Sequence, residues 1–153
     1  MHAIDARWPD ISIYDQPLLH ASFQNSKIEN IVPHGESPVP PAYAFGEELP
    51  HEWCYYYQKA DLARQMGDWQ EVARLGDEAQ KLGYHPNDPA EWMPFLQAYA
   101  FLGDEKQVKG ISTRINTEPF YRQQACTNLS VMAEHGYPLP SEMRSYMSEL
   151  FCK

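Results

Sequence analysis

No stretch of the sequence is apolar over the roughly 18 residues that a helix needs to cross a membrane. The start also lacks the pattern of a secretory signal peptide, because Asp5, Arg7 and Asp10 interrupt any apolar run. If the 153 residues are the whole protein, these absences predict a soluble cytoplasmic protein. If they are the C-terminal segment of a longer chain, they predict a soluble domain tethered to a membrane.

Basic residues are scarce as well, with 12 Lys and Arg against 21 Asp and Glu, and the formal charge is −9. They are scattered along the chain and form no cluster. Binding to nucleic acid or to anionic lipid requires a basic surface that neutralises phosphate. We therefore predict no nucleic-acid partner and, given the missing apolar run, no membrane insertion of this segment.

Cysteine is also scarce in this sequence. Cys54, Cys126 and Cys152 are an odd number and form no Cys-Xaa-Xaa-Cys pair, which predicts neither a disulfide framework nor a zinc knuckle. His51 and Cys54 lie three residues apart on an expected helix, but two ligands alone do not make a metal site. Phosphate-binding loops, dinucleotide-binding glycine patterns and the nucleophile elbow are missing too. We predict no cofactor, no metal and no catalytic residue.

The chain does have enough apolar residues for one core, since 43% are hydrophobic and 13% are aromatic. Its two parts differ in proline. The first 50 residues hold seven of the 13 prolines, which excludes long helices there. We therefore divide the chain into a proline-rich arm, residues 1–49, and a helical domain, residues 50–153.

Within the arm, Ile11–Tyr14 and Lys27–Val32 contain alternating and β-branched residues, which predicts two short strands that could pair as a hairpin. Pro33–Pro41 predicts an extended connector or, as an alternative, a ligand for a proline-recognising domain. Ala42–Leu49 is expected to fold back onto the first helix of the domain.

Residues 51–86 contain the start, the corner and the end of a helical hairpin. Pro50 fits the first turn of a helix, and Glu52 favours its positive end. The expected corner is Gly67 followed by Asp68 as the cap of the second helix. One apolar stripe is Trp53, Tyr56, Tyr57, Ala60 and Ala63, with Lys59, Asp61 and Arg64 off the stripe, and the second is Trp69, Val72, Leu75, Ala79 and Leu82, closed by Gly83 and Pro86.

The pattern then repeats. Gly67-Asp68 aligns with Gly103-Asp104, which gives a period of 36 residues (103 − 67), and Val72 then matches Val108. The second pair starts at Pro89 and tolerates Pro94 near its first turn. A third pair starts at Pro119, turns at Gly136 and resumes at Pro140-Ser141. We predict an all-α domain of six helices in three antiparallel pairs.

Several of these residues fall at the spacings of the tetratricopeptide family. They are Trp92, Phe95, Tyr99 and Gly103 in the second pair, and Ala60, Gly67, Trp69 and Ala79 in the first. Residues 51–137 thus resemble that family, which implies an α-solenoid of about three helical pairs. The departures are Gly76, where the family has a bulky residue, the longer repeat, and a third unit that keeps little beyond Leu129 and Gly136.

In such a solenoid the first helices of successive pairs form the concave wall. By the family's spacing, the partner-binding residues are Tyr57, Asp61, Arg64, Gln65, Met93, Gln97, Phe101, Gln123 and Ser130. This mixture suits an extended peptide or protein segment, unless residues 1–49 of the same chain cover the wall. Both possibilities remain open at this point. If a partner binds there, Tyr57→Ala and Arg64→Ala should weaken it without lowering stability.

A second resemblance lies in Pro40–Tyr57, Lys59–Gln65 and Gly67–Trp69. These runs are similar to the soluble C-terminal region of bacterial multi-pass membrane proteins of glycosyltransferase type. Such proteins carry their transfer chemistry in the membrane portion, which is absent from this sequence. The resemblance implies an accessory module that is part of, or partner to, a membrane-associated glycosyltransferase-like protein.

The leading hypothesis is therefore a non-catalytic interaction module. The alternative is a glycan-binding or hydrolytic domain that uses the aromatic wall and Glu47, Glu48 or Glu52 as acid and base. Carboxylates at a helix start more commonly stabilise its positive end. Asn128-Leu129-Ser130 matches the glycosylation tripeptide, but it falls within an expected helix and is assigned no role.

Overall fold

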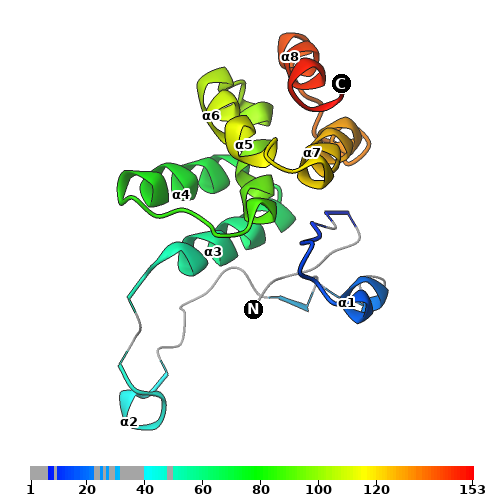
Figure 1. Ribbon diagram of the computed structural model, residues 1–153. Coiled ribbons are helices and arrows are strands. Elements are labelled where there is room, and N and C mark those ends of the chain that lie inside the picture. Colours follow the sequence, from blue (N-terminus) through cyan, green and yellow to red (C-terminus); the bar gives the residue numbers. More distant parts are fainter. Residues whose placement is uncertain are drawn as a thin grey trace.

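The computed structural model describes residues 7, 8, 10–22, 25, 27, 30, 31, 40–47 and 50–153. Within these residues the protein is all-α, which confirms the predicted class (Figure 1). The elements are α1 (Pro17–Ser22), α2 (Ala42–Phe45), α3 (Trp53–Gln65), α4 (Trp69–Lys81), the 3₁₀ helix η3 (Pro89–Trp92), α5 (Met93–Leu102), α6 (Glu105–Ile115), α7 (Pro119–Val131) and α8 (Ser141–Phe151). None of these described helices is long and apolar enough to span a bilayer.

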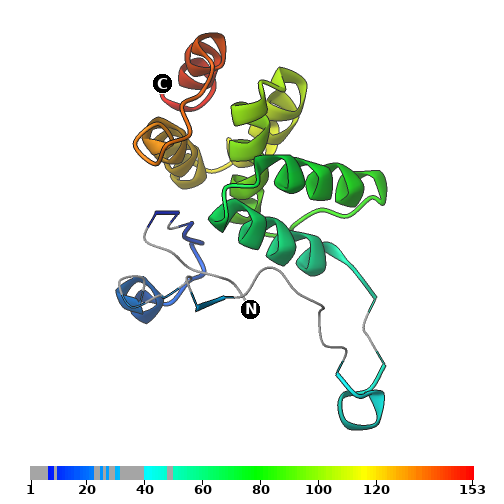
Figure 2. The ribbon, with the colours of Figure 1, turned by 180° about the vertical axis from the view of Figure 1, so that it is seen from behind.

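From α3 onward, each helix packs against the next one along the chain, and Figures 1 and 2 show this succession from opposite sides. The first helices of the three pairs, α3, α5 and α7, also contact one another in order. Short corners reverse the chain within each pair. As a result, α3, α5 and α7 form one layer of the domain.

The corners of the first two pairs have the same local structure. Gly67 has a φ of 75° and Gly103 a φ of 79°, in the left-handed region that favours glycine. Asp68 and Asp104 follow them, and each accepts a hydrogen bond at 3.0 Å from the backbone N–H three residues later. This geometry confirms the helix ends and caps predicted from the repeat.

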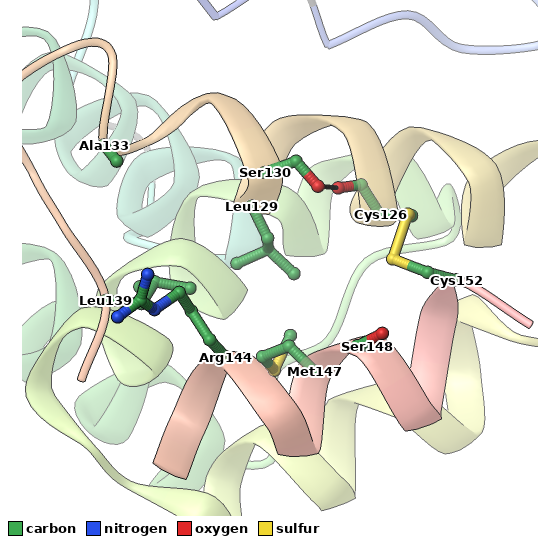
Figure 3. Close-up of a pocket in the computed structure, with 9 residues that line it drawn as sticks. All are labelled: Cys126, Leu129, Ser130, Ala133, Leu139, Arg144, Met147, Ser148 and Cys152. Carbon is green, nitrogen blue, oxygen red and sulfur yellow. Dashed lines mark hydrogen bonds between the residues drawn. A yellow bond between two sulfur atoms is a disulfide. The ribbon is translucent and has the colours of Figure 1, made fainter. Parts of the chain in front are cut away.

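The third pair is held differently, because Cys126 on α7 forms a disulfide with Cys152, which follows α8 (Figure 3). The prediction that the cysteines form no disulfide is therefore wrong. The two residues are 26 positions apart, and only the pairing of α7 with α8 brings them together. The odd residue is Cys54, which is exposed and free.

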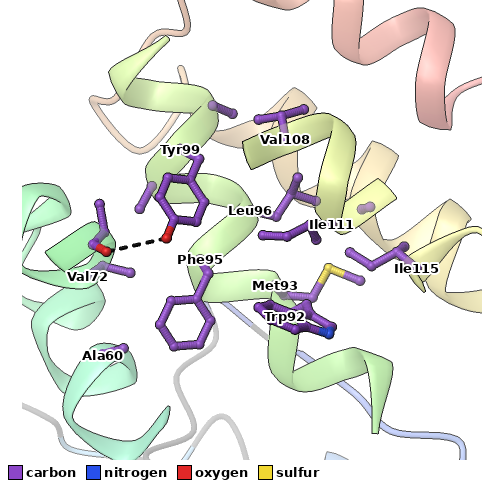
Figure 4. Close-up of a cluster of buried hydrophobic side chains, with 14 of the residues drawn as sticks. Ala60, Val72, Trp92, Met93, Phe95, Leu96, Tyr99, Val108, Ile111 and Ile115 are labelled. Atoms are coloured by element: carbon purple, nitrogen blue, oxygen red, sulfur yellow. Dashed lines mark hydrogen bonds between the residues drawn. The ribbon is translucent and has the colours of Figure 1, made fainter. Parts of the chain in front are cut away.

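Equivalent positions of the first two helical pairs both contribute to the core. Val72 and Val108 are both fully buried. Phe95 and Tyr99 of α5 lie close to α4 (Figure 4), where a Cβ added at Gly76 would lie 2.7 Å from the Phe95 ring and from the Tyr99 hydroxyl. The glycine therefore gives space to the large side chains of α5.

The boundaries of α5 and α4 decide the environments of Pro94 and Leu82. Pro94 lies within the first two residues of α5, where proline is tolerated, as predicted. Leu82 was placed on the buried stripe of α4, but it is 55% exposed. That prediction is wrong because α4 ends at Lys81 and Leu82 is its C-cap residue.

The predicted strands of the arm are not found in its described part. Ile11–Tyr14 is irregular chain and a turn, in which the Ser12 backbone N–H donates to the Asp15 carboxylate at 2.8 Å. Of Lys27–Val32, the residues at 27, 30 and 31 are in no strand, and the others lie outside the described residues. Pro33–Pro41 lies outside them as well, apart from its last two prolines.

The expected return of Ala42–Leu49 onto the domain is also wrong for its described residues, 42–47. They contain the short helix α2, which has no buried residue, and the Tyr43 side chain is 93% exposed. Gly46, which follows α2, has a φ of 81°, in the region that favours glycine. In Figure 1, α2 projects away from the helical pairs.

Candidate functional site

Six of the nine residues predicted to bind a partner are buried. They are Tyr57, Asp61, Arg64, Gln65, Met93 and Gln97. Asp61 and Arg64 lie off the apolar stripe of α3, yet each is only 1% exposed. The reason is that another part of the chain covers this wall.

The other three predicted residues are not fully buried. Phe101 is half-buried against Trp69, with ring centroids 5.8 Å apart. Gln123 is exposed. Ser130 is exposed too, donates to the Cys126 carbonyl oxygen at 2.7 Å, and lines a cavity of about 300 Å³ between α7 and α8 (Figure 3). The predicted set is therefore brought together on α3 and the start of α5 and not on α7.

The cover is supplied by Arg7, Trp8 and Asp10–Ile13, which we call the N-terminal segment. Trp8 is 2% exposed, and its ring meets Trp69 edge to face at 5.8 Å and His135 at 4.7 Å. The Arg64 guanidinium lies 5.9 Å from the centre of the same indole. Of the two possibilities left open by the sequence, the structure has the wall covered by the chain itself.

Asp10 is the second buried anchor of the segment, at 4% exposure. One of its carboxylate oxygens pairs with the Arg64 guanidinium, and the other accepts a hydrogen bond from the Asn128 amide at 2.6 Å. Arg64 also pairs with Asp61 on its own helix and donates to Gln97 of α5 at 2.9 Å. Residues from α3 and α7 thus contact the Asp10 carboxylate directly, and Gln97 of α5 contacts its guanidinium partner.

This cluster holds two carboxylates and one guanidinium in a site closed to water. Burial raises the pKa of Asp10; the Arg64 charge opposes the shift, and the Asp61 charge adds to it. Burial alone would lower the pKa of Arg64, but the two carboxylates raise it overall, so the guanidinium stays charged. Burial, followed by the Asp61 charge, likewise raises the pKa of Tyr57 and keeps its phenol neutral.

The rest of the segment is held through its backbone. The Gln124 amide donates to the Ile11 carbonyl oxygen at 3.0 Å, and the Tyr121 hydroxyl accepts from the Ile13 N–H at 3.3 Å. Backbone contacts of this kind hold an extended chain whatever its side chains are. At the beginning of the segment, the Arg7 guanidinium donates to the Gln65 carbonyl oxygen at 3.4 Å.

Sequence reasoning missed the residues that complete this site. They are Trp8 and Asp10 on the segment, and Tyr121, Gln124 and Asn128 on α7. One signal was available, since a tryptophan in a proline-rich arm is costly to leave in water. Asn128 had been noticed only as part of a glycosylation tripeptide, and its side chain is buried in the site.

The residues considered as metal ligands and as acid and base lie elsewhere in the structure. The His51 ring stacks on Tyr55 at 3.6 Å, and no group of three or more potential metal ligands occurs in the described part of the chain. Glu47 and Glu52 are exposed, and Glu52 is the N-cap residue of α3, where a carboxylate favours the helix end. Glu48 lies outside the described residues.

Comparisons of this chain with protein-family models, with curated proteins and with solved structures found no match. A function for the wall must therefore be inferred from its own contacts.

Proposed function

We propose that this chain is a non-catalytic interaction module, a tetratricopeptide-like solenoid of about three helical pairs that binds an extended protein or peptide segment. The observation that carries this proposal is the N-terminal segment itself. It lies against α3 and α7, buries one tryptophan and one aspartate there, and is held through its backbone by α7. The wall thus has the contacts that a peptide site needs.

The solenoid part of the proposal is supported by two features. The corners at Gly67-Asp68 and Gly103-Asp104 have the same geometry, so the first two pairs are built alike. The first helices then contact one another in the order α3, α5, α7, as stacked repeats require.

The direct test uses a labelled peptide with the sequence of residues 7–14 and the full-length variant Trp8→Ala/Asp10→Ala, whose own segment has lost its anchors. We expect this variant to bind the peptide, measured by fluorescence anisotropy. The wild-type chain should bind it much more weakly, because a tethered segment competes at an effective concentration on the order of millimolar. A scrambled peptide of the same composition is the control.

If the variant retains its helical circular dichroism and a cooperative thermal transition but does not bind the peptide, the proposed function is wrong. The same conclusion follows if the scrambled peptide binds equally well, since the wall would then be a non-specific surface.

The second part of the proposal is that the module belongs to, or associates with, a membrane-bound glycosyltransferase-like protein. Its support is the resemblance of residues 40–69 to the soluble region of such proteins. In fractionated source cells, an antibody against residues 50–153 should detect the antigen in the membrane pellet. Recovery of the antigen in the soluble fraction alone would contradict this association.

The alternative function, glycan binding or hydrolysis, is favoured by one observation. Glu52 lines a cleft of about 800 Å³ together with Trp53, Tyr55, Tyr84 and Glu91. Aromatic rings beside carboxylates suit sugar binding. If the cleft takes sugars, chitotriose or maltotriose should shift the Trp53 indole resonance, and the Glu52→Gln variant should respond less. Unchanged spectra at millimolar sugar would remove this alternative.

A further inference from the structure

The N-terminal segment covers a surface of α3 and α7 that also includes Trp69 and His135, and we call this surface the groove. We infer that the groove is specific for a chain in which tryptophan precedes aspartate by two residues, and that Trp8 and Asp10 are an intramolecular copy of that ligand. The inference rests on the proposed function and adds the chemical class of the partner. That partner is an extended segment with a Trp-Xaa-Asp sequence, which must displace the resident segment.

The site for the indole selects an aromatic ring of this size. Trp8 contacts the rings of Trp69 and His135, with interplanar angles of 86° and 64°, and the Arg64 guanidinium lies near the indole. Edge-to-face contacts require a planar ring, and nearly the whole indole is removed from water. An aliphatic or smaller side chain at this position would leave an unfilled cavity.

The site for the carboxyl group selects its two oxygens and its length. Arg64 contacts one oxygen of Asp10 and Asn128 the other, so both oxygens are used. Asp61 and Gln97 act as positioning residues, because they hold the guanidinium from the domain side. A glutamate would carry its carboxylate one methylene further, past this pair of donors.

The spacing between the two anchors is also set locally. The backbone N–H of Asp10 donates to the Trp8 carbonyl oxygen at 2.9 Å, and this bond holds the two anchor residues close together. A segment with the same two side chains at another spacing would not place both in their sites.

The resident segment leaves hydrogen-bonding capacity unused, which makes it replaceable. Among the described residues, both amide atoms of Gln65, the Gln97 Nε2, the Gln124 Oε1 and the Arg64 Nε are buried without a partner. Buried polar groups that lack a hydrogen bond are destabilising. A partner that supplies hydrogen bonds to these atoms in addition to Trp-Xaa-Asp would bind more tightly than the resident segment.

The test measures peptides against the opened chain, full-length Trp8→Ala/Asp10→Ala. Relative to the peptide of residues 7–14, we expect peptides carrying Trp8→Ala to lose about 100-fold in affinity and those carrying Asp10→Ala about 10-fold. Asp10→Glu should cost nearly as much as Asp10→Ala. A peptide carrying Tyr14→Ala is the matched control and should bind within about threefold, since Tyr14 is 80% exposed.

A change in the groove provides an independent readout. In the opened chain that also carries Asn128→Ala, the loss caused by Asp10→Ala in the peptide should shrink severalfold, while the loss caused by Trp8→Ala should stay the same. This double-mutant cycle separates recognition of the carboxylate from a general loss of fold.

The outcomes distinguish the two proposals. If the opened chain binds all these peptides equally, the groove is a peptide site without this specificity, and the inference fails while the proposed function stands. If it binds none of them, the proposed function fails. If the wild-type chain binds the peptide as tightly as the opened chain does, its own segment does not occupy the groove, and the inference fails. A concentration-dependent wild-type dimer that Trp8→Ala abolishes would overturn it too, because the segments would then be exchanged between two copies.

Discussion

The structure of the helical domain and the structure of the N-terminal segment depend on interactions of different range along the chain. In the domain, the local sequence specifies where each helix begins and ends, as the corners at Gly67 and Gly103 illustrate. The segment contains little regular structure, and its position depends on side chains as far away in sequence as Asn128. Short-range signals therefore define the scaffold, and long-range contacts define what the scaffold holds.

The charged residues of α3 and α4 show the same difference. Arg64 faces the segment and is buried among Asp10, Asp61 and Gln97. Arg74 on α4 faces water and pairs with Glu71 and Glu78 on its own helix. Both are arginines paired with two carboxylates, but only the first is part of the contact between the two regions.

The largest expected effect comes from breaking the buried cluster. Arg64→Ala should lower the free energy of unfolding by about 3–5 kcal/mol, because it leaves buried carboxylates without their cation. The matched change, Arg74→Ala, should cost less than about 1 kcal/mol, since its ion pairs are exposed. Urea denaturation of both variants measures the difference. Equal costs would mean that Arg64 is open to water and that the segment does not cover it.

This expectation reverses the one drawn from sequence, which held that Arg64→Ala and Tyr57→Ala would leave stability unchanged. The hydrophobic periodicity of α3 identifies only the face that meets α4 and α5. A second buried face made of Asp61, Arg64 and Gln65 has no apolar pattern, so periodicity assigns it to solvent. Its burial depends on residues more than 50 positions earlier in the chain.

The second prediction concerns the third pair, whose helices are joined by a disulfide. Cys126→Ser/Cys152→Ser should lower the free energy of unfolding by about 3 kcal/mol, as expected for the loss of a cross-link across 26 residues. Cys54→Ser is the control and should have almost no effect, because this thiol is free and exposed. Calorimetry under non-reducing conditions checks both. A transition temperature that is the same for the double variant and wild type would contradict the pairing.

The third prediction sharpens the comparison of the two corners. Gly67→Ala and Gly103→Ala share the strain of a positive φ, about 1–2 kcal/mol. At Gly67 the new Cβ would also lie 2.0 Å from the Tyr137 hydroxyl, while at Gly103 nothing lies within 4 Å. We expect Gly67→Ala to cost about 2–3 kcal/mol, more than Gly103→Ala, by chemical denaturation. The reverse order would show that Tyr137 does not pack on the first corner.

The smallest effect is a dependence on pH. Burial raises the pKa of Asp10 when the segment is bound. The Asp10 carboxyl group therefore holds a proton more tightly in the groove than in the released chain. Binding therefore takes up a proton, and lowering the pH from 7 toward the ordinary value of 3.8 should strengthen it. We expect the residue 7–14 peptide to bind the opened chain a few-fold more tightly at the lower pH.

Two controls belong to this pH series. The peptide with Asp10→Asn should show a flat profile, and the opened chain with His135→Gln removes any contribution of the imidazole next to Trp8. Binding that weakens steadily on acidification in both protein backgrounds would mean that the carboxylate is more stable as an anion in the groove.

Sequence patterns were sufficient for the repeated part of the fold. Gly67, Asp68 and their equivalents act within one turn of themselves, so their effect is visible in any short window. The pairing of Cys126 with Cys152 and the contact of Asp10 with Asn128 are not visible in this way, because each depends on how separate helices are stacked. The strand predicted at Ile11–Tyr14 is absent for the same reason, because Ile11 and Ile13 bond through their backbone to Gln124 and Tyr121 of α7.

The central claim, that the chain's own segment occupies the groove, is tested most directly by nuclear Overhauser effects in the intact protein. The ring centres of Trp8 and His135 are 4.7 Å apart, so cross-peaks between their ring protons are expected. They should disappear in the presence of excess Trp-Xaa-Asp peptide. A Trp8 indole at random-coil chemical shifts, with no cross-peak to His135 or Trp69, would contradict the claim.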